Sequence, residues 1–395
     1  MSARLCCKAF TPMLSRSWLA LATALLMFPQ VAETLYSPAL VSLAEAFAVS
    51  AAQASLTLSL YFVAFAVGVL AWGRACDLWG RRPAMLAGLL LYTTAALAAL
   101  LAVDFSQLLL ARIVAAFAAA VGSVVTQTIL RDRHAGPELA RVFSLIGVCL
   151  ALSPALGLIS GAWLDRLFGY HGVLAGQLLM AAPLLAWTWR GLPETRPAAQ
   201  ATPALGRVLR RLLHDRRVLL ASALVAVFNI SVFSWYSLAP FVFERLGASP
   251  WMGYSGAALA LGSLLGARLN ARLLQRGVAT ARLLRLACLL DLLAALALLG
   301  LGDSLWTVLA MALVMFAFAM AIPLVLGSAL VDYADCRGTA GALFGLFYYL
   351  QIGAGLLLAG ACQAMGATLF VCALAGWALA IDYEQPGRAL LHSRG

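Results

Sequence analysis

Charged residues are scarce in this chain of 395 residues. Only 11% of its residues are Asp, Glu, Lys or Arg, whereas 64% are hydrophobic. A water-soluble chain of this length cannot bury so much apolar surface, so its solvent must be lipid. The scarcity of charge therefore excludes a soluble globular protein and predicts an all-α integral membrane protein.

Lysine is almost absent as well: Lys8 is the single example, and arginine carries the formal net charge of +11. In a soluble protein this balance would suggest binding to nucleic acid. Here the arginines cluster between apolar runs, where they indicate how a membrane protein is oriented. We expect the chain to contact the lipid bilayer and no nucleic acid.

The sequence also lacks the motifs of common catalytic and metal sites. Its eight cysteines form no CxxC pair and have no histidine at metal-ligand spacing. A Gly-Lys-Ser/Thr phosphate loop is missing, and the few ionisable groups within apolar runs form no nucleophile constellation. We therefore expect neither an enzyme nor a bound metal or cofactor.

The apolar runs each approach the ~20 residues that a helix needs to cross a bilayer. The longest polar connection, 191–216, begins with prolines and continues with arginines, as a linker followed by an amphipathic cytoplasmic helix would. It divides the runs six and six, so we predict two six-helix bundles, 1–190 and 217–395. The predicted spans are 17–43, 53–73, 83–103, 106–130, 139–163, 170–190, 217–243, 251–271, 281–301, 304–328, 339–363 and 365–382.

The arginines are unevenly divided between the two sides of these spans. The connections on one side hold Arg166 and Arg245 as their only cations, whereas Arg81, Arg82 and the cluster from Arg268 to Arg285 fall on the other. Because positive connections stay in the cytoplasm, we expect both termini to be cytoplasmic.

A short motif joins the second and third spans, and it consists of Gly73, Asp77, Gly80, Arg81 and Arg82. Its glycines remove the side chains that would hold two antiparallel helices apart. The spacing resembles the G-x-x-x-D-x-x-G-R-R loop of the major facilitator superfamily. That resemblance implies the superfamily's fold of twelve transmembrane helices in two bundles. It also implies a loop that packs against the other half and controls which face is open.

An acid, Asp132, ends the fourth span on the same cytoplasmic side. The superfamily places an acid here that pairs with the arginines of the loop. We therefore expect Arg81 or Arg82 as the partner of Asp132 and count it as part of the gate.

Glu33 is an ionisable residue in the middle of the first span, between Pro29 and Pro38. A charge at this depth costs roughly 2.5–3.5 kcal/mol, so it indicates a cavity or a function. A carboxyl group in a partly dry cavity can gain and lose a proton near neutral pH, as proton coupling requires. The alternative is a buried glutamate that is hydrogen-bonded for structure.

The residues around Glu33 resemble the first helix of drug:proton antiporters of the bicyclomycin and chloramphenicol resistance type. The resemblance rests on Pro29 and on the run from Tyr36 to Leu40. In that family an acid stands two residues before the tyrosine. Here Thr34 holds that place and Glu33 precedes it, which turns the side chain by ~100° around the helix.

Arg112 opens the fourth helix and resembles the arginine of the family's R-x-x-q-G motif, although Ala115 and Ala116 replace the Gln-Gly pair. The resemblance implies that it faces the cavity and responds to protonation of a nearby acid. The alternative is an arginine at the outer boundary that extends to the water, since Asp104 is close in sequence.

The fifth span carries Pro154, Gly157 and Gly161, whose glycines form a small-x-x-x-small face for close helix contact. This run resembles the antiporter signature of the superfamily, with Leu158 in place of the proline of its Gly-Pro pair. Generic helix packing would explain the same glycines.

The second half offers fewer candidates. Asp291 lies mid-span, and we expect it to have a structural partner rather than a coupling role. Aromatic and amide side chains suit a permissive apolar pocket, although most aromatics in membrane helices serve packing. The candidate pocket residues are Tyr36, Asn229, Trp235, Tyr236, Tyr348, Tyr349 and Gln351.

Together these features predict a secondary transporter of the inner membrane that exports drugs or other small amphipathic compounds in exchange for protons. Glu33 would carry the proton, Arg112 would respond to it, and Asp77 with Arg81 would form the cytoplasmic gate. The proton gradient would replace any cofactor, and we expect a monomer. One alternative is a transporter for a sugar or an amino-acid derivative, and another is a membrane-embedded enzyme or a receptor that transports nothing.

Overall fold

The computed structural model describes residues 16–134, 136–196, 205–333 and 336–383, and these ranges contain helices but no strand. The all-helical fold that the composition predicts is therefore confirmed. The elements of the first half are α1 (Arg16–Tyr36), a 3₁₀ turn (Ser37–Ala39), α2 (Leu40–Ala46), α3 (Ala51–Trp79), α4 (Arg81–Leu100), α5 (Phe105–Arg133) and α6 (Gly136–Gly191).

A short amphipathic helix, α7 (Leu205–Leu213), follows and leads into the second half. The second half consists of α8 (Arg216–Arg245), a 3₁₀ turn (Ser249–Trp251), α9 (Met252–Gln275), α10 (Thr280–Leu301), α11 (Thr307–Ala329), a 3₁₀ turn (Val331–Tyr333), α12 (Arg337–Cys362) and α13 (Met365–Tyr383).

Twelve membrane-spanning helices can be identified in the described chain. Ten segments are long and apolar enough to cross a bilayer. One of the ten covers both helices of α6, which Gly169 separates with a φ of 60°. The remaining helix, α9, is less apolar because it contains several glycine, serine and arginine residues. The predicted number of spans and their order are confirmed.

The helix boundaries at the motif loop differ from the prediction. We expected the second span to end at Gly73, but α3 continues through Asp77 to Trp79, and α4 begins at Arg81. Gly80 is thus the whole connection. Its φ of 103° and ψ of 161° lie where side chains other than hydrogen are strongly disfavoured, so the chain can reverse within one residue.

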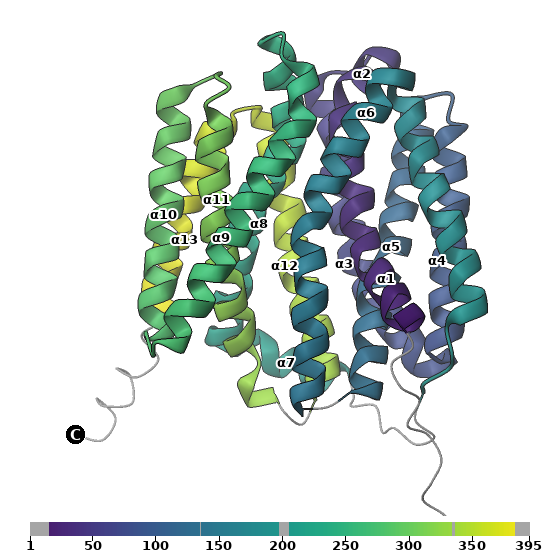
Figure 1. Ribbon diagram of the computed structural model, residues 1–395, viewed down its shortest axis with the longest axis vertical. Coiled ribbons are helices and arrows are strands. Elements are labelled where there is room, and N and C mark those ends of the chain that lie inside the picture. Colours follow the sequence, from purple (N-terminus) through teal and green to yellow (C-terminus); the bar gives the residue numbers. More distant parts are fainter. Residues whose placement is uncertain (1–15, 135, 197–204, 334–335, 384–395) are drawn as a thin grey trace, which may run out of the picture.

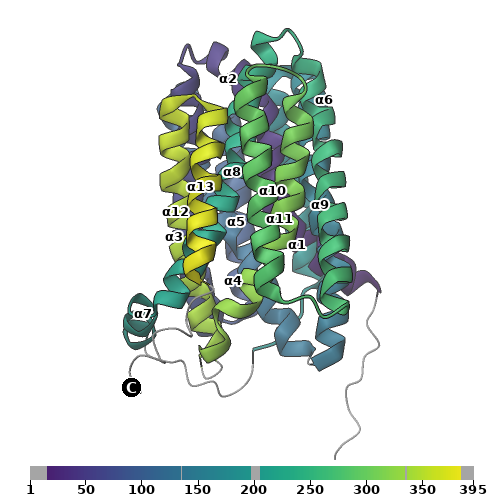
Figure 2. The same cartoon turned by 90° about the vertical axis from the view of Figure 1, so that its left-hand side faces the viewer.

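The helices gather into two groups that follow the order of the chain (Figure 1). One hydrophobic core lies among α1 and α3–α6, and further cores lie among α8–α13. α7 packs Val208 and Leu212 against the second half. It lies at the end of the molecule where most connections contain arginine (Figures 1 and 2). The predicted linker around it includes Pro197 and Pro203, which lie outside the described residues.

We name the two ends of the molecule by their connections. The arginine-rich end carries the Gly80 turn, α7 and the turn between α9 and α10, whereas the far end carries α2 and the turns at Gly169 and Gly302. The halves meet along α3 and α12, where a methyl group on Gly360 would lie 3.0 Å from Ser55 Cβ. Towards the far end, the Ser37 hydroxyl also donates a hydrogen bond to the Tyr236 carbonyl of α8.

Candidate functional site

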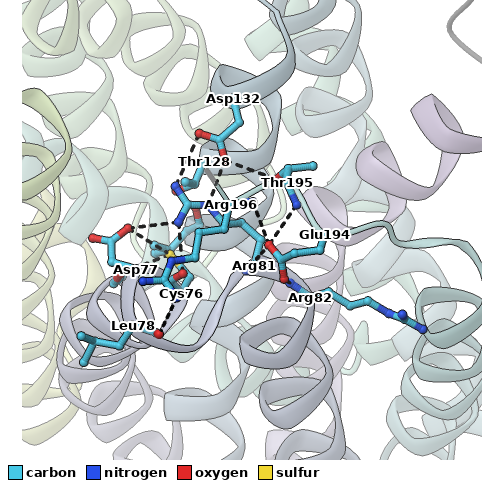
Figure 3. A network of polar contacts seen from close by, with 12 residues as sticks. Cys76, Asp77, Leu78, Arg81, Arg82, Thr128, Asp132, Glu194, Thr195 and Arg196 are labelled. Carbon is cyan, nitrogen blue, oxygen red and sulfur yellow. Dashed lines mark hydrogen bonds and ion pairs between the residues drawn. The ribbon is translucent and has the colours of Figure 1, made fainter. Parts of the chain in front are cut away.

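Two groups of residues stand out as candidate sites, one at the arginine-rich end and one inside the membrane. The first surrounds Arg81, whose side chain is 1% exposed (Figure 3). Its Nε lies 2.8 Å from Asp132 Oδ2, and its Nη1 lies 3.5 Å from Asp77 Oδ1 and donates to the Cys76 carbonyl at 3.1 Å. The predicted pairing of Asp132 with an arginine of the loop is confirmed, and Arg81 is the partner.

Arg82, the other candidate partner of Asp132, contacts α6 instead. Its Nη2 donates a hydrogen bond of 2.8 Å to the Trp189 carbonyl near the end of α6. The start of the motif faces the other half, since a methyl group on Gly73 would lie 3.8 Å from Ala342 Cβ of α12. The motif therefore ties α3 and α4 to α5 and α6 while one of its residues contacts the second bundle.

Glu194 completes this group, and the sequence analysis missed it. Its carboxylate accepts hydrogen bonds from the backbone N–H groups of Arg81 at 2.9 Å and Arg82 at 3.1 Å, which are the first residues of α4 (Figure 3). It also accepts from the N–H groups of Thr195 and Arg196. Gly80 itself offers no side chain to cap α4, so a carboxylate from after α6 fills the positive end of the helix.

The hydrogen bonds around Glu194 change its acidity. Partial burial raises the pKa of this carboxyl, but the four backbone N–H donors outweigh it and hold the pKa below its ordinary value. The same position explains the second glycine of the motif, because a methyl group on Gly80 would lie 2.5 Å from Glu194 Oε2. One sequence signal could have found Glu194, namely an acid that directly follows a membrane span on the side rich in arginine.

The second group lies around Glu33 in the middle of α1. Glu33 is 4% exposed and Arg112 of α5 is 1% exposed. The guanidinium carbon of Arg112 lies 3.8 Å from the centre of the Tyr36 ring and 5.2 Å from that of Tyr61. The alternative of an arginine that reaches outer water is therefore wrong. Asp104, its supposed partner, instead caps α5 by accepting from the Gln107 N–H.

Gln177 of α6 holds Arg112 in this position. Arg112 Nη1 donates to Gln177 Oε1 at 3.3 Å, and Gln177 Nε2 donates to the Ala32 carbonyl at 2.6 Å, next to Glu33. The amide thus bridges α5 to the part of α1 that follows Pro29. Gln177 is a polar side chain within an apolar span, and we overlooked that signal.

Several buried polar atoms of this group have no hydrogen-bond partner in the described chain. They are Glu33 Oε1, Arg112 Nε and Nη2, and the hydroxyls of Tyr61, Tyr92 and Tyr236. No ion pair joins Glu33 to Arg112 within those residues, although the charge of Arg112 acts on the Glu33 carboxyl. Because buried polar groups are normally paired, this concentration marks a candidate site for protons, water or a solute.

Tyrosines of both halves surround Glu33. Its charge acts on Tyr61 of α3, on Tyr236 of α8 and on Tyr349 of α12. Glu33 therefore lies where the two bundles meet. Tyr236 and Tyr349 were predicted, whereas Tyr61 was not.

Aromatic rings continue from this point along the contact between the halves. The Phe62 ring of α3 lies 4.3 Å from that of Phe233 in α8, and the Phe65 ring lies 4.9 Å from that of Tyr349. The ring of the predicted Tyr348 is tilted against that of Tyr349, with 4.4 Å between the ring centres. We call these five side chains the aromatic cluster.

The other predicted pocket residues lie elsewhere or use their polar groups within the protein. Trp235 is buried in the core of the second half against Phe243, at 6.0 Å between rings. The Asn229 amide donates to the Val225 carbonyl, and the Gln351 amide donates to Ser222 Oγ at 3.0 Å. Packing and helix contacts thus account for these three residues.

A cavity of about 240 Å³ opens at the far end of the second half, away from Glu33. Its walls come from α8, α10 and the turn between α12 and α13, and they include Arg245 and Asp303, which pair at 2.8 Å. None of the predicted pocket residues lines this cavity.

The glycines of α6 bring that helix against α1 beside Glu33. A methyl group on Gly157 would collide with Thr34 Oγ1, and one on Gly161 would collide with the Leu35 carbonyl oxygen. The predicted face for close helix contact is therefore present. Leu158, which replaces the proline of the antiporter signature, is fully buried and faces Gly256 of α9.

Asp291 of α10 is 4% exposed, as expected of an acid that avoids lipid. It acts electrostatically on the Cys372 thiol of α13. It makes no hydrogen bond or ion pair with any residue that the structure describes, so the expected structural partner is not found. Nor does that part of the chain contain a group of three or more His, Cys, Asp and Glu side chains that could hold a metal ion.

Two helical bundles that meet at a buried acid and arginine define a membrane transport protein. A sequence model of the Major Facilitator Superfamily matches residues 19–356, and the chain belongs to that family. It is a transporter rather than an enzyme.

Individual relatives agree with this assignment. A Rickettsia felis protein named "Uncharacterized transporter" is 32% identical over 82% of this chain and 84% of its own length. The chloramphenicol resistance protein of Pseudomonas aeruginosa is 30% identical over 82% of this chain and 80% of its own length. Among solved structures, the POT family transporter PepTSo has the same fold, with a TM-score of 0.76, 12% identity, and coverage of 97% and 98% of the two chains.

Proposed function

We propose that the chain exports drugs or other small amphipathic compounds across the inner membrane in exchange for protons, by alternating access. The observation that carries this proposal is the unpaired, buried Glu33 at the meeting point of the two bundles, beside Arg112. The relative that is named for chloramphenicol resistance supports the cargo. The proton gradient supplies the energy, no cofactor takes part, and the monomer is the working unit.

In this proposal the Arg112 guanidinium and the proton take turns in neutralising the Glu33 carboxylate. When Glu33 is ionised, the Arg112 guanidinium offers the compensating charge. When Glu33 takes a proton, Arg112 keeps its contacts with Gln177 and the Tyr36 ring, and the solute leaves. The aromatic cluster gives an amphipathic solute flat apolar surfaces with hydroxyl groups at their edges.

The arginine-rich end is placed in the cytoplasm, because positive connections are retained there. The contacts between α6 and α9 then suggest which way this state faces. They are close near the far end, where Gly253 faces Ala162 and Gly256 faces Leu158. Gly147 shares the helix face of Leu158 by its spacing of eleven residues, and a methyl group on it would meet no described residue within 4 Å. Between α6 and α9 the two halves are therefore closed at the far end.

A metabolite transporter of the same superfamily is the second candidate. Leu158 favours it, because the antiporter signature has a proline at that position. The two functions differ in what cells expressing the protein tolerate and in what the purified protein moves.

The test combines both readouts. Cells that overexpress the chain are grown against a panel that includes chloramphenicol and other amphipathic compounds, and everted membrane vesicles are used to follow drug-induced proton release. We expect increased tolerance and proton release with at least one compound, and neither in cells that express Glu33→Gln. The matched control is Glu45→Gln, which changes an exposed acid of α2. Unchanged tolerance throughout, with sugar or amino-acid derivative uptake instead, would support the second candidate.

A further inference from the structure

The turn between α9 and α10 contains a concentration of positive charge that the transport cycle does not use. Arginines occur at 268, 272, 276, 282 and 285, whereas no Asp or Glu occurs between Glu244 and Asp291. The equivalent turn of the first half, between its second and third helices, is the Gly80 turn. There Arg81 is paired with Asp77 and Asp132. The second half thus repeats the positive charge of this turn without its acids.

The arginine side chains continue the lipid-facing surface of α9. Leu261 is 58% exposed and Leu265 is 46% exposed. Arg268 and Arg272 follow at spacings of three and four residues, which places all four side chains on one face of the helix. That face therefore changes from leucine to arginine towards the arginine-rich end.

α10 shows the same change in the opposite chain direction. Arg282 is exposed in its first turn, and Leu289 and Leu293 follow on the same face with 42% and 50% exposure. Arg276, also exposed, directly follows the last residue of α9. The two helices that this turn joins thus present arginine close to it and exposed leucine further along.

None of Arg268, Arg272, Arg276 and Arg282 forms a side-chain hydrogen bond or an ion pair with another described residue. We name these four residues the arginine face. A tendency to keep positive connections in the cytoplasm would explain arginine anywhere in the turn. It does not explain why all four side chains are exposed, why they extend the leucine faces, or why acids are excluded over the whole segment.

We propose that the arginine face binds the headgroup phosphate of anionic phospholipids in the adjacent leaflet. A guanidinium forms two parallel hydrogen bonds with phosphate oxygens, and its carbon chain can lie along the acyl region below. Each basic residue near an anionic membrane surface adds to the affinity for the lipid. Neighbouring arginines can together bind the two phosphates of one diphosphatidyl headgroup or those of two monophosphatidyl headgroups. The inference does not depend on which solute the protein transports.

The test measures lipid binding to the full purified chain. Native mass spectrometry in detergent gives the apparent affinity for phosphatidylglycerol and for phosphatidylcholine of equal chain length. We expect phosphatidylglycerol to bind at least about tenfold more tightly, and the preference to disappear in the variant with Arg268, Arg272, Arg276 and Arg282 changed to Gln. Equal affinity of the unchanged protein for the two lipids would overturn the proposal.

A matched control removes the same charge elsewhere at the arginine-rich end. It changes Arg74, Arg190, Arg207 and Arg210, which are all exposed, to Gln. The control variant should keep most of the preference for phosphatidylglycerol. An equal loss in both variants would show that overall charge, and not the arginine face, determines the preference, and it would overturn the proposal. Inorganic phosphate at millimolar concentration should not displace the lipid. If it does so fully, the face is a site for free anions and the proposal is wrong.

A milder variant guards against misfolding or inversion of the hairpin. Changing only Arg276 and Arg282 to Gln leaves two arginines to hold the orientation. It should weaken phosphatidylglycerol binding by about three- to tenfold while the thermal midpoint in phosphatidylcholine nanodiscs stays unchanged. An unaltered affinity in this folded variant would contradict the proposal.

Discussion

Glu194 accepts a hydrogen bond of 2.9 Å from the backbone N–H of Arg81, a residue 113 positions earlier in the chain. This contact fastens the segment after α6 to the first turn of α4. It uses only the backbone of Arg81, whose side chain contacts Asp132 and Asp77. The Gly80 turn is thus held from two sides, and each side can be tested separately.

The pH dependence of this contact follows from the lowered pKa of Glu194. A carboxyl group whose pKa is lower in the folded state contributes stability above its unfolded pKa, and the contribution is lost as the pH falls through the folded value. Glu194→Gln should therefore lower the stability by about 1 kcal/mol at pH 7, as loss of a helix cap does. Below about pH 4 its thermal midpoint should approach that of the unchanged protein.

The control for this experiment is Glu244→Gln, because Glu244 is exposed and makes no side-chain hydrogen bond with a described residue. Its midpoint should follow the unchanged protein at both pH values. A Glu194→Gln variant as stable as the unchanged protein at pH 7 would show that the cap contributes nothing.

The pair of Arg81 and Asp132 should matter more than pairs on the surface. Asp132→Asn leaves the buried Arg81 guanidinium without its closest counter-charge, so we expect a loss of about 3 kcal/mol and reduced transport. Asp382→Asn removes the partner of Arg216 from an exposed pair and should cost less than about 1 kcal/mol. Thermal unfolding in the same detergent compares the two. Similar effects would argue against the importance of burial.

The contact between α6 and α1 should be sensitive to a single methyl group. Gly157→Ala would push a methyl group into Thr34 Oγ1 beside Glu33, and α1 would have to move. We expect transport to fall by about tenfold or more, because small displacements at a reactive centre have large effects on rates. Gly300→Ala is the control, since a methyl group there would lie more than 4 Å from every residue that the structure describes. Full transport by Gly157→Ala, measured as vesicle flux, would contradict this account of the helix contact.

Asp291 provides a comparison with Glu33. Both acids are 4% exposed, but only Glu33 lies at the meeting point of the halves and near an arginine. Asp291→Asn should therefore keep transport within about twofold, and it should not lower the thermal midpoint, because removing an unpaired buried acid relieves a cost. Loss of proton-driven transport in a well-folded Asp291→Asn protein would assign Asp291 a part in coupling.

Much of the fold follows from local features of the sequence. Lipid allows few ways to pair the backbone, so long apolar runs predict the helices and arginine marks their connections. The pairing of Arg81 with Asp132 was also predictable, because the loop motif and the acid that ends the fourth span fall on the same side of the membrane. The end of α3 was not, because its last turn is stabilised by hydrogen bonds from Arg81 to the Cys76 carbonyl and from Arg196 to the Leu78 carbonyl, which the sequence does not reveal.

The candidate site was predicted less completely. Glu33 and Arg112 were evident from the cost of charge in lipid, yet the residues that hold them came from distant parts of the chain. Gln177 meets Arg112 and the Ala32 carbonyl only when the helices of the first half pack, and Tyr349 comes near Glu33 only when the two halves meet. Many other amides and tyrosines of the sequence look the same beforehand. Trp235 shows the reverse case, since an aromatic residue in a plausible position proved to be part of a core.

The central claim is that Glu33 carries the proton that drives transport. The direct measurement is flux in proteoliposomes under a pH gradient, with the unchanged protein and with Glu33→Gln, while the internal pH is recorded. We expect Glu33→Gln to retain solute exchange without a gradient but to lose both gradient-driven accumulation and the accompanying proton movement. Gradient-driven transport and proton movement at the normal level in Glu33→Gln would contradict the claim.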